Sequence, residues 1–148
     1  MPTNRLMLTA VAAIGLTCGL FAAEVEKPLY DRLGGQPAIQ AVASDLVDRI
    51  LKDERVNKWF AHAASTPENT ASYKATLTEF LCQGLGGPCK YAGRDMVTAH
   101  KGRGVTNAAF SAVVEDLVAT LDKFKVPEKE KGELLKILGG LKPAIVTE

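Results

Sequence analysis

This chain of 148 residues contains few of the residues on which common functional sites depend. It has two histidines and three cysteines, too few for a zinc site with several histidine and cysteine ligands. It also lacks a phosphate-binding P-loop, a dinucleotide-type glycine fingerprint and a Gly-x-Ser-x-Gly elbow. These absences argue against a zinc protein, a nucleotide-binding enzyme and a serine hydrolase.

An excess of charge of one sign is also missing. The sequence has 18 Lys and Arg against 17 Asp and Glu, a formal net charge of +1. This balance gives no electrostatic basis for binding nucleic acid. Hydrophobic residues make up 47% of the chain, which is too large a share for a disordered protein, and the length suits one domain.

The first 23 residues resemble an export signal. Arg5 is the only charged residue among them, and the run from Leu6 to Ala23 is uncharged and ends in small residues. An uncleaved membrane anchor is the alternative, because this run of 18 residues is just long enough to span a bilayer. We predict a signal peptide over residues 1–23, a mature domain over 24–148, export to the periplasm, and no membrane association after cleavage.

Signal cleavage would leave two cysteines, Cys82 and Cys89. In an exported protein an even pair is most simply a disulfide, and the glycine-rich segment 83–88 lets its ends meet. A redox-active pair is the alternative, but the sequence lacks the Cys-x-x-Cys spacing typical of such pairs.

The mature chain has the apolar periodicity of helices, with no sustained alternation typical of strands. We therefore predict an all-α fold. A loop is expected over residues 63–70, with a helix-start signal at Thr66–Glu68 inside it. The expected helical segments cover residues 37–51, 54–62, 71–84, 95–100, a stretch capped by Thr106, and a last helix opened by Pro127 that reaches Ile145.

Only His62 and His100 offer an imidazole. His62 lies at a loop entrance, as surface histidines often do. His100 ends a short helix in which Met96 and Ala99 share its face. A histidine that projects from a short helix toward an apolar cavity suits a haem iron, which needs one neutral imidazole nitrogen. A partly buried structural histidine is the alternative.

Several motifs together resemble the truncated haemoglobins, in particular group I. They occur in the family's order and spacing, and the resemblance extends from Leu29 to Val146. The matching segments are 29–35 (LYDRLGG) with 37–39 (PAI), 59–60 (WF), 85–88 (LGGP) with 91–96 (YAGRDM), 100–106 (HKGRGVT) and 126–127 (VP).

The resemblance implies a two-over-two helical sandwich around a b-type haem, with His100 as the proximal iron ligand. The sequence lacks Cys-x-x-Cys-His, so c-type covalent attachment is not indicated. Lys90, Arg94 or Arg103 would meet the haem propionates, unless they are solvated surface charges. The residues expected to line the pocket, or else to form plain core, are Phe60, Phe80, Leu81, Met96, Val105, Phe110, Val113 and Leu117.

The distal side departs from the family pattern. Val47 occupies the position where the family often has a ligand-binding tyrosine, and Leu77 replaces the frequent distal glutamine. Tyr73, and less favourably Thr76, remain as hydrogen-bond donors for bound O₂. The alternative for Tyr73 is a ring at the pocket mouth with its hydroxyl in water.

The resemblance implies reversible binding of the diatomic ligands O₂, NO and CO, as in oxygen transport. An enzyme is the alternative, acting as an NO dioxygenase, a nitrite reductase or a peroxidase. Dioxygenation would need an external reductase, because no flavin or nicotinamide domain is fused to the chain. A haem-free helical regulator is the third hypothesis.

Overall fold

A computed structural model describes residues 25–148, and the predicted signal peptide over 1–23 lies outside them. Four long helices and short helical turns make up the described part, which contains no strand. The all-α prediction is therefore confirmed. The elements are α1 (Leu29–Arg32), α2 (Gly35–Lys52), η1 (Asn57–Phe60), α3 (Pro67–Gly84), α4 (Met96–His100), α5 (Asn107–Lys123), α6 (Glu128–Gly139) and α7 (Lys142–Ile145).

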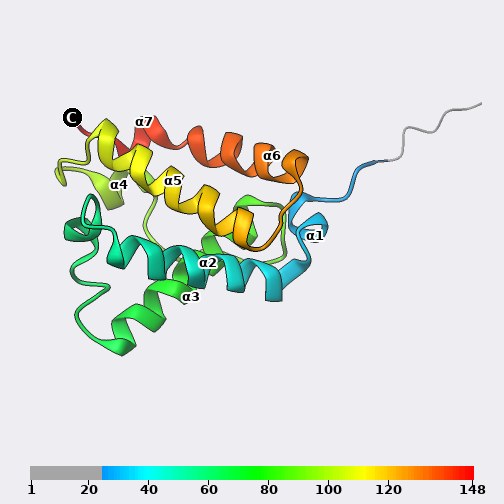
Figure 1. The fold of residues 1–148 in the computed structure, drawn as a ribbon, viewed down its shortest axis with the longest axis horizontal. Helices are drawn as coiled ribbons and strands as arrows, with labels where there is room; N and C mark the ends of the chain where they lie inside the picture. The colour runs from blue at the N-terminus through cyan, green and yellow to red at the C-terminus, as the bar shows by residue number, and fades with distance from the viewer. Residues whose placement is uncertain (1–24) are drawn as a thin grey trace, which may run out of the picture.

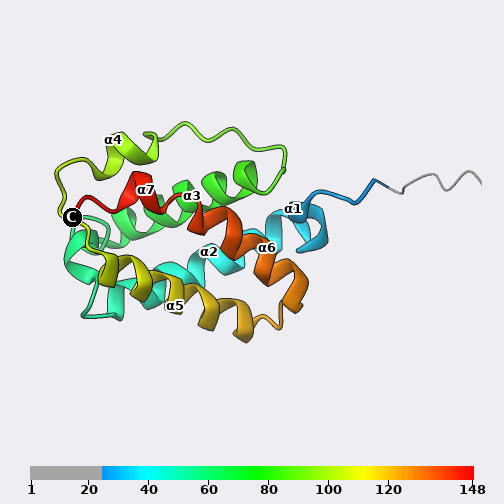
Figure 2. The ribbon, with the colours of Figure 1, turned by 90° about the horizontal axis from the view of Figure 1, so that it is seen from above.

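The long helices form two pairs (Figure 1). Helices α2 and α3 make one pair, α5 and α6 the other, and within each pair the chain runs in opposite directions. The pairs meet through contacts between α2 and α5. Viewed from above, α4 and its preceding loop lie along one side of the molecule, next to α7 (Figure 2).

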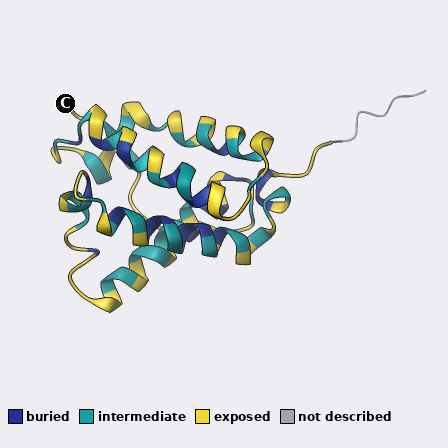
Figure 3. Cartoon of the chain, in the orientation of Figure 1, coloured by how far each residue is buried: buried dark blue, intermediate teal, exposed yellow. Residues whose placement is uncertain are grey.

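Helix α2 is the centre of the core. Its apolar side chains repeat at helical spacing, as predicted, and the buried set includes Ile39, Ala43 and Ile50. Buried segments of α2 and α5 are visible between the two layers (Figure 3). Gly34 precedes α2 with a φ of 108°, a left-handed conformation that glycine adopts without steric cost.

A polar cluster also joins α2 to α5. The Asp45 carboxylate on α2 accepts hydrogen bonds from Arg49 Nε at 2.8 Å, from Thr120 Oγ1 at 2.9 Å, and from Lys123 Nζ. Partial burial acts to raise the pKa of Asp45, but these donors outweigh it and lower the pKa to about 2. The two long helices are therefore held together by charge as well as by apolar packing.

Helix α3 begins four residues earlier than the predicted start at residue 71. The start signal within the expected loop is the real one, because Thr66 Oγ1 accepts a hydrogen bond from Asn69 N at 3.1 Å and Pro67 takes the first helical position. The prediction of a loop over 63–70 is thus wrong for residues 67–70.

The end of α3 is closed by a glycine turn. Gly86 has a φ of 84°, Gly87 N donates to Cys82 O at 2.7 Å, and Gly86 N donates to Gln83 O at 3.2 Å. This pattern is a Schellman motif, which satisfies the last helical carbonyls. The turn also accepts a hydrogen bond from α1, because Tyr30 N donates to Leu85 O at 2.9 Å.

The last predicted helix is interrupted. Helix α6 ends at Gly139, and Ile145 belongs to the separate turn α7. The adjacent Gly139 and Gly140 explain the break, since glycine disfavours helix continuation. None of the helices within residues 25–148 is long and apolar enough to cross a membrane.

Candidate functional site

His100 is the last residue of α4, as predicted, and its ring is oriented by its own helix. Nδ1 lies 2.8 Å from the Met96 carbonyl oxygen one turn earlier. A carbonyl only accepts, so Nδ1 is the donor, and in the neutral imidazole Nε2 then carries the lone pair. Nε2 has no hydrogen-bond partner among the described residues. This is the tautomer and orientation that an imidazole needs to bind a metal through Nε2.

The segment after His100 is tied to distant parts of the chain. Trp59 Nε1 donates to Arg103 O at 2.9 Å, and Arg103 Nη2 donates back to Trp59 O at 2.8 Å. Val105 N donates to Thr147 Oγ1 at 3.1 Å, and Thr147 N donates to Val105 O at 3.0 Å. The histidine segment is therefore attached both to η1 and to the C-terminal end.

The rings of Phe60 and Tyr73, two of the predicted pocket residues, contact each other. Their ring centroids are 5.8 Å apart and their planes are tilted by 58°. Burial raises the pKa of the Tyr73 hydroxyl to about 12; Tyr91 adds to this rise and Arg103 opposes it. Tyr73 therefore stays protonated near neutral pH and keeps its capacity to donate a hydrogen bond.

Two other polar side chains near Tyr73 on α3, the predicted donor Thr76 and Lys74, are already engaged. Thr76 Oγ1 donates to Ser72 O at 2.9 Å, a bond within α3. Lys74 Nζ forms an ion pair with Asp48 Oδ1 at 2.7 Å. Tyr73 has no hydrogen-bond partner in the part of the chain that the structure describes. Among the predicted distal donors, it is the one left available.

The predicted apolar pocket residues are buried or half-buried. Val47 is 0% exposed, and Leu81 and Val105 are also buried. Four half-buried members pack against this core: Phe60, Leu77, Phe80 and Val113. Met96 and Phe110 are half-buried too. Leu117 is fully part of the core.

Two of these residues, Phe80 and Leu81, line an apolar cavity of about 180 Å³ between the ends of α3 and α6. Its other walls come from Gly84, Leu85, Ile137, Leu138 and Leu141. His100 does not line this cavity. One of its walls, Leu141, directly precedes α7, and α7 contacts α4.

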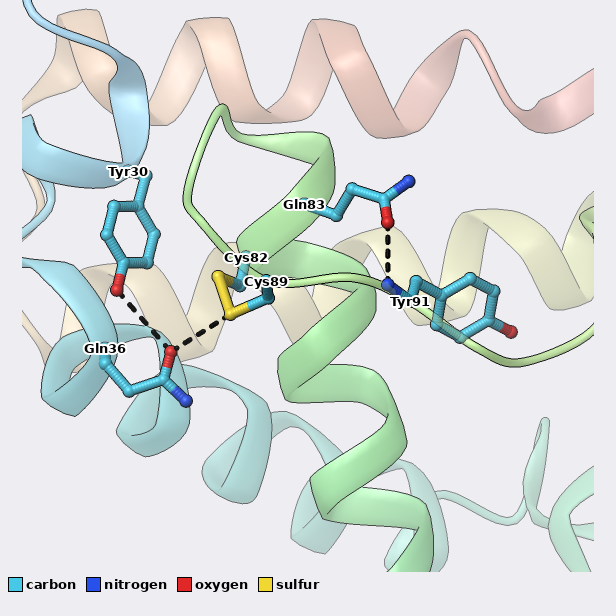
Figure 4. Close-up of a disulfide and its surroundings, with 6 residues drawn as sticks. All are labelled: Tyr30, Gln36, Cys82, Gln83, Cys89 and Tyr91. Carbon is cyan, nitrogen blue, oxygen red and sulfur yellow. Dashed lines mark hydrogen bonds between the residues drawn. A yellow bond between two sulfur atoms is a disulfide. The ribbon is translucent and has the colours of Figure 1, made fainter.

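The predicted disulfide is present: Cys82 and Cys89 are joined, with their Cα atoms 5.7 Å apart (Figure 4). The bond connects the last turn of α3 to the loop that leads to α4. Gln36 Oε1 lies 3.4 Å from Cys89 Sγ. This is a polar contact rather than a hydrogen bond, since a disulfide sulfur carries no proton.

Sequence reasoning missed the role of Tyr91 in the same loop. Tyr91 N donates to Gln83 Oε1 at 2.6 Å, its hydroxyl donates to Arg94 O at 2.9 Å, and its ring meets Phe80 edge-on at 5.2 Å. No periodic pattern marks these contacts, because Tyr91 lies outside any helix. In the sequence, Tyr91 stands out only as part of the family motif over residues 91–96.

The cations predicted near the propionates are at the surface. Lys90, Arg94 and Arg103 are all exposed, and the Arg103 guanidinium donates to the Trp59 carbonyl. His62 is exposed too, as its position at the start of the turn after η1 predicts.

These residues fit a haem. An iron porphyrin needs an imidazole nitrogen with a free lone pair, apolar and aromatic walls, and cations where its carboxylates reach solvent. His100 has an imidazole whose Nδ1 is engaged by Met96 O, so its Nε2 suits this role. Phe60, Leu77 and Phe80 supply half-buried apolar surface, and Lys90 and Arg94 supply exposed cations.

Comparison with known proteins identifies the family. Residues 28–147 match the model of the bacterial-like globin family. A group 1 truncated haemoglobin of Synechocystis is 36% identical over 115 residues, which cover 75% of this chain and 89% of that protein. Another, from Mycolicibacterium paratuberculosis, is 34% identical over 119 residues, covering 80% of this chain and 84% of that protein.

The fold agrees with this assignment. The crystal structure of the truncated haemoglobin of Tetrahymena pyriformis in its Fe(III) form superposes with a TM-score of 0.73 at 30% identity. The match covers 82% of this chain and all of that chain. The chain therefore belongs to the bacterial-like globins and resembles their group 1 truncated haemoglobins, with a two-over-two helical fold that binds haem iron and gaseous ligands.

Proposed function

We propose that this protein binds O₂, NO and CO reversibly at a non-covalent b-type haem whose iron is held by His100. The observation that carries the proposal is the hydrogen bond between His100 Nδ1 and Met96 O at 2.8 Å. It fixes the ring and directs the Nε2 lone pair away from its own helix. The haem would supply the iron that binds the gas, while the chain supplies the axial nitrogen and the surrounding walls.

The two histidines provide a matched test. His100→Ala and His62→Ala each remove one imidazole, but His62 is exposed and has no role in the proposal. Visible spectra of the ferric, ferrous and CO-bound forms should change in His100→Ala and match the wild type in His62→Ala. Added imidazole should restore the spectrum of a His100→Gly variant. An unchanged spectrum in His100→Ala would overturn the assignment.

On the opposite side of the haem, we assign the Tyr73 hydroxyl as the donor to bound O₂. Val47 and Leu77 cannot donate hydrogen bonds, and the Thr76 hydroxyl is committed to Ser72 O. The Tyr73 ring is placed by contact with Phe60, and its raised pKa keeps the proton on the hydroxyl. Bound O₂ carries partial negative charge and is stabilised by such a donor, whereas CO depends on it less.

The proposed setting is the periplasm. Residues 1–23 have the composition of a signal peptide, and the Cys82–Cys89 disulfide is of a kind that persists in oxidising compartments. The enzymatic alternative would need an external reductase to restore ferrous iron after each turnover. Steady NO consumption by the purified protein with an electron donor would favour the enzymatic alternative over simple binding.

A further inference from the structure

Helix α4, which carries His100, has little packing of its own. It contains five residues, none of them buried, and its main helix contacts are with α7. Its capping residue, Asp95, accepts a hydrogen bond from Thr98 N and so stabilises the turn without attaching it to the body. The position of α4 therefore depends on α7 and on the segments that flank α4.

On the upstream side, a compact set of contacts ties the chain to the end of α3. We define it as the proximal strap: Cys82, Gln83, Cys89 and Tyr91 (Figure 4). Cys82 is 0% exposed, so one end of the disulfide is anchored in the core. Gln83 Oε1 holds Tyr91 N at 2.6 Å, two residues beyond the disulfide.

Tyr91 carries this attachment on toward α4. Its ring packs edge-on against Phe80, and its hydroxyl donates to Arg94 O at 2.9 Å. Arg94 directly precedes Asp95, the capping residue of α4. A continuous series of contacts thus connects the buried end of α3 with the first turn of the histidine helix.

We propose that the proximal strap is a positioning device for His100: the Cys82–Cys89 disulfide fixes where α4 starts and hence how the imidazole meets the iron. This inference rests on the assignment of His100 as the axial ligand. The disulfide closes a ring between residues only seven apart in sequence, so its effect on the unfolded chain is at the small end of the range. Its main effect is local, on a loop whose residues are otherwise largely exposed.

Cys89→Ser is the most direct test, because it breaks the disulfide at its half-buried end and leaves Cys82 in the core. In the haem-loaded protein, amide hydrogen exchange over residues 88–101 should become faster while α5 stays unchanged. The iron–histidine stretching band of the ferrous protein should shift, and ferric haem should leave about tenfold faster or more. Cys82→Ala should reproduce these effects, which excludes a contribution from the new serine.

Gln83 offers a matched pair within the strap. Gln83→Glu keeps an oxygen acceptor for Tyr91 N and should behave as the wild type, whereas Gln83→Leu should resemble Cys89→Ser in weaker form. Wild-type exchange over 88–101 in Cys89→Ser would overturn the proposal, and so would faster exchange with an unshifted iron–histidine band. Failure of the His100 assignment is distinguishable, because it would appear as an unchanged spectrum of His100→Ala.

Discussion

Trp59 and Arg103, 44 residues apart in sequence, exchange two hydrogen bonds. Trp59 directly precedes Phe60, which contacts Tyr73, and Arg103 follows His100 by three residues. The pair therefore connects the two proposed sides of the haem site. It is the downstream counterpart of the proximal strap.

Removing this connection should loosen the histidine segment from η1. Trp59→Phe keeps the aromatic ring but loses the Nε1 donor, and we expect the local opening free energy of residues 101–105 to fall by about 0.5–1.5 kcal/mol. Hydrogen exchange of these amides measures it. Lys58→Ala is the control, since Lys58 Nζ lies over the Trp59 ring face and takes no part in the two hydrogen bonds between Trp59 and Arg103. Equal exchange in Trp59→Phe and the wild type would contradict the role of the pair.

The assignment of Tyr73 predicts a selective effect on O₂. Tyr73→Phe removes the hydroxyl and keeps the ring against Phe60, so O₂ should dissociate roughly tenfold faster, the equivalent of one lost hydrogen bond. CO dissociation should change much less. Stopped-flow or flash-photolysis measurements distinguish the two gases.

Thr76→Val is the control for this experiment, because the Thr76 hydroxyl is bonded within α3. It should leave O₂ dissociation unchanged. An unchanged O₂ rate in Tyr73→Phe would remove Tyr73 from the mechanism, and a change in Thr76→Val would identify the other hydroxyl as the donor.

The Asp45 cluster predicts an acid-dependent contribution to stability. The folded-state pKa of about 2 lies below the ordinary value of 3.8, so this stabilisation is complete above about pH 4 and is lost as the pH falls toward 2. Asp45→Asn should lower the free energy of unfolding by roughly 1–3 kcal/mol at pH 7. Urea titrations should show that the difference in free energy of unfolding between Asp45→Asn and wild type shrinks as the pH falls from about 4 toward 2.

Asp48→Asn provides the comparison, since Asp48 is an exposed residue on the same helix with a single lysine partner. Asp48→Asn should lower the free energy of unfolding at pH 7 by no more than about 0.5–1 kcal/mol. A difference between Asp45→Asn and wild type that does not vary with pH would show that packing, not charge, accounts for the loss.

Export predicts the covalent form of the mature protein. Mass analysis of material from the native cell should show a chain that begins near Glu24. This chain should be lighter by two hydrogens than the same chain with free thiols, because Cys82 and Cys89 are joined. A chain that retains Met1, or free thiols at both positions, would argue against export and cleavage.

Local signals account for much of what could be predicted. The apolar repeat located α2 and α5, and the caps at Thr66 and Thr106 are read directly from residue type. The start of α3 was placed too late because residues 67–70 are polar and carry no apolar period. The disulfide was predictable because only two cysteines remain in the mature chain.

Contacts between distant segments were not predictable. Trp59 and Arg103 meet only because η1 and the segment after α4 are brought together by the fold. The ring of Tyr91 contacts Phe80 only once the loop before α4 has folded back on α3. Because contacts made in the folded chain are not visible in the sequence, the sequence alone leaves Tyr73 and Thr76 as competing hydrogen-bond donors. The hydrogen bond from Thr76 to Ser72 O separates them.

Gly87 shows how closely the strap restricts its surroundings. A β-carbon at this residue would lie 2.6 Å from Tyr30 Cδ2, 2.7 Å from Cys82 Sγ and 2.8 Å from Cys82 O. Alanine is therefore excluded at position 87 as long as the disulfide and the tyrosine keep their places. Positions 30, 82 and 87 are therefore epistatic: a change at any one of them alters which amino acids the other two can accept.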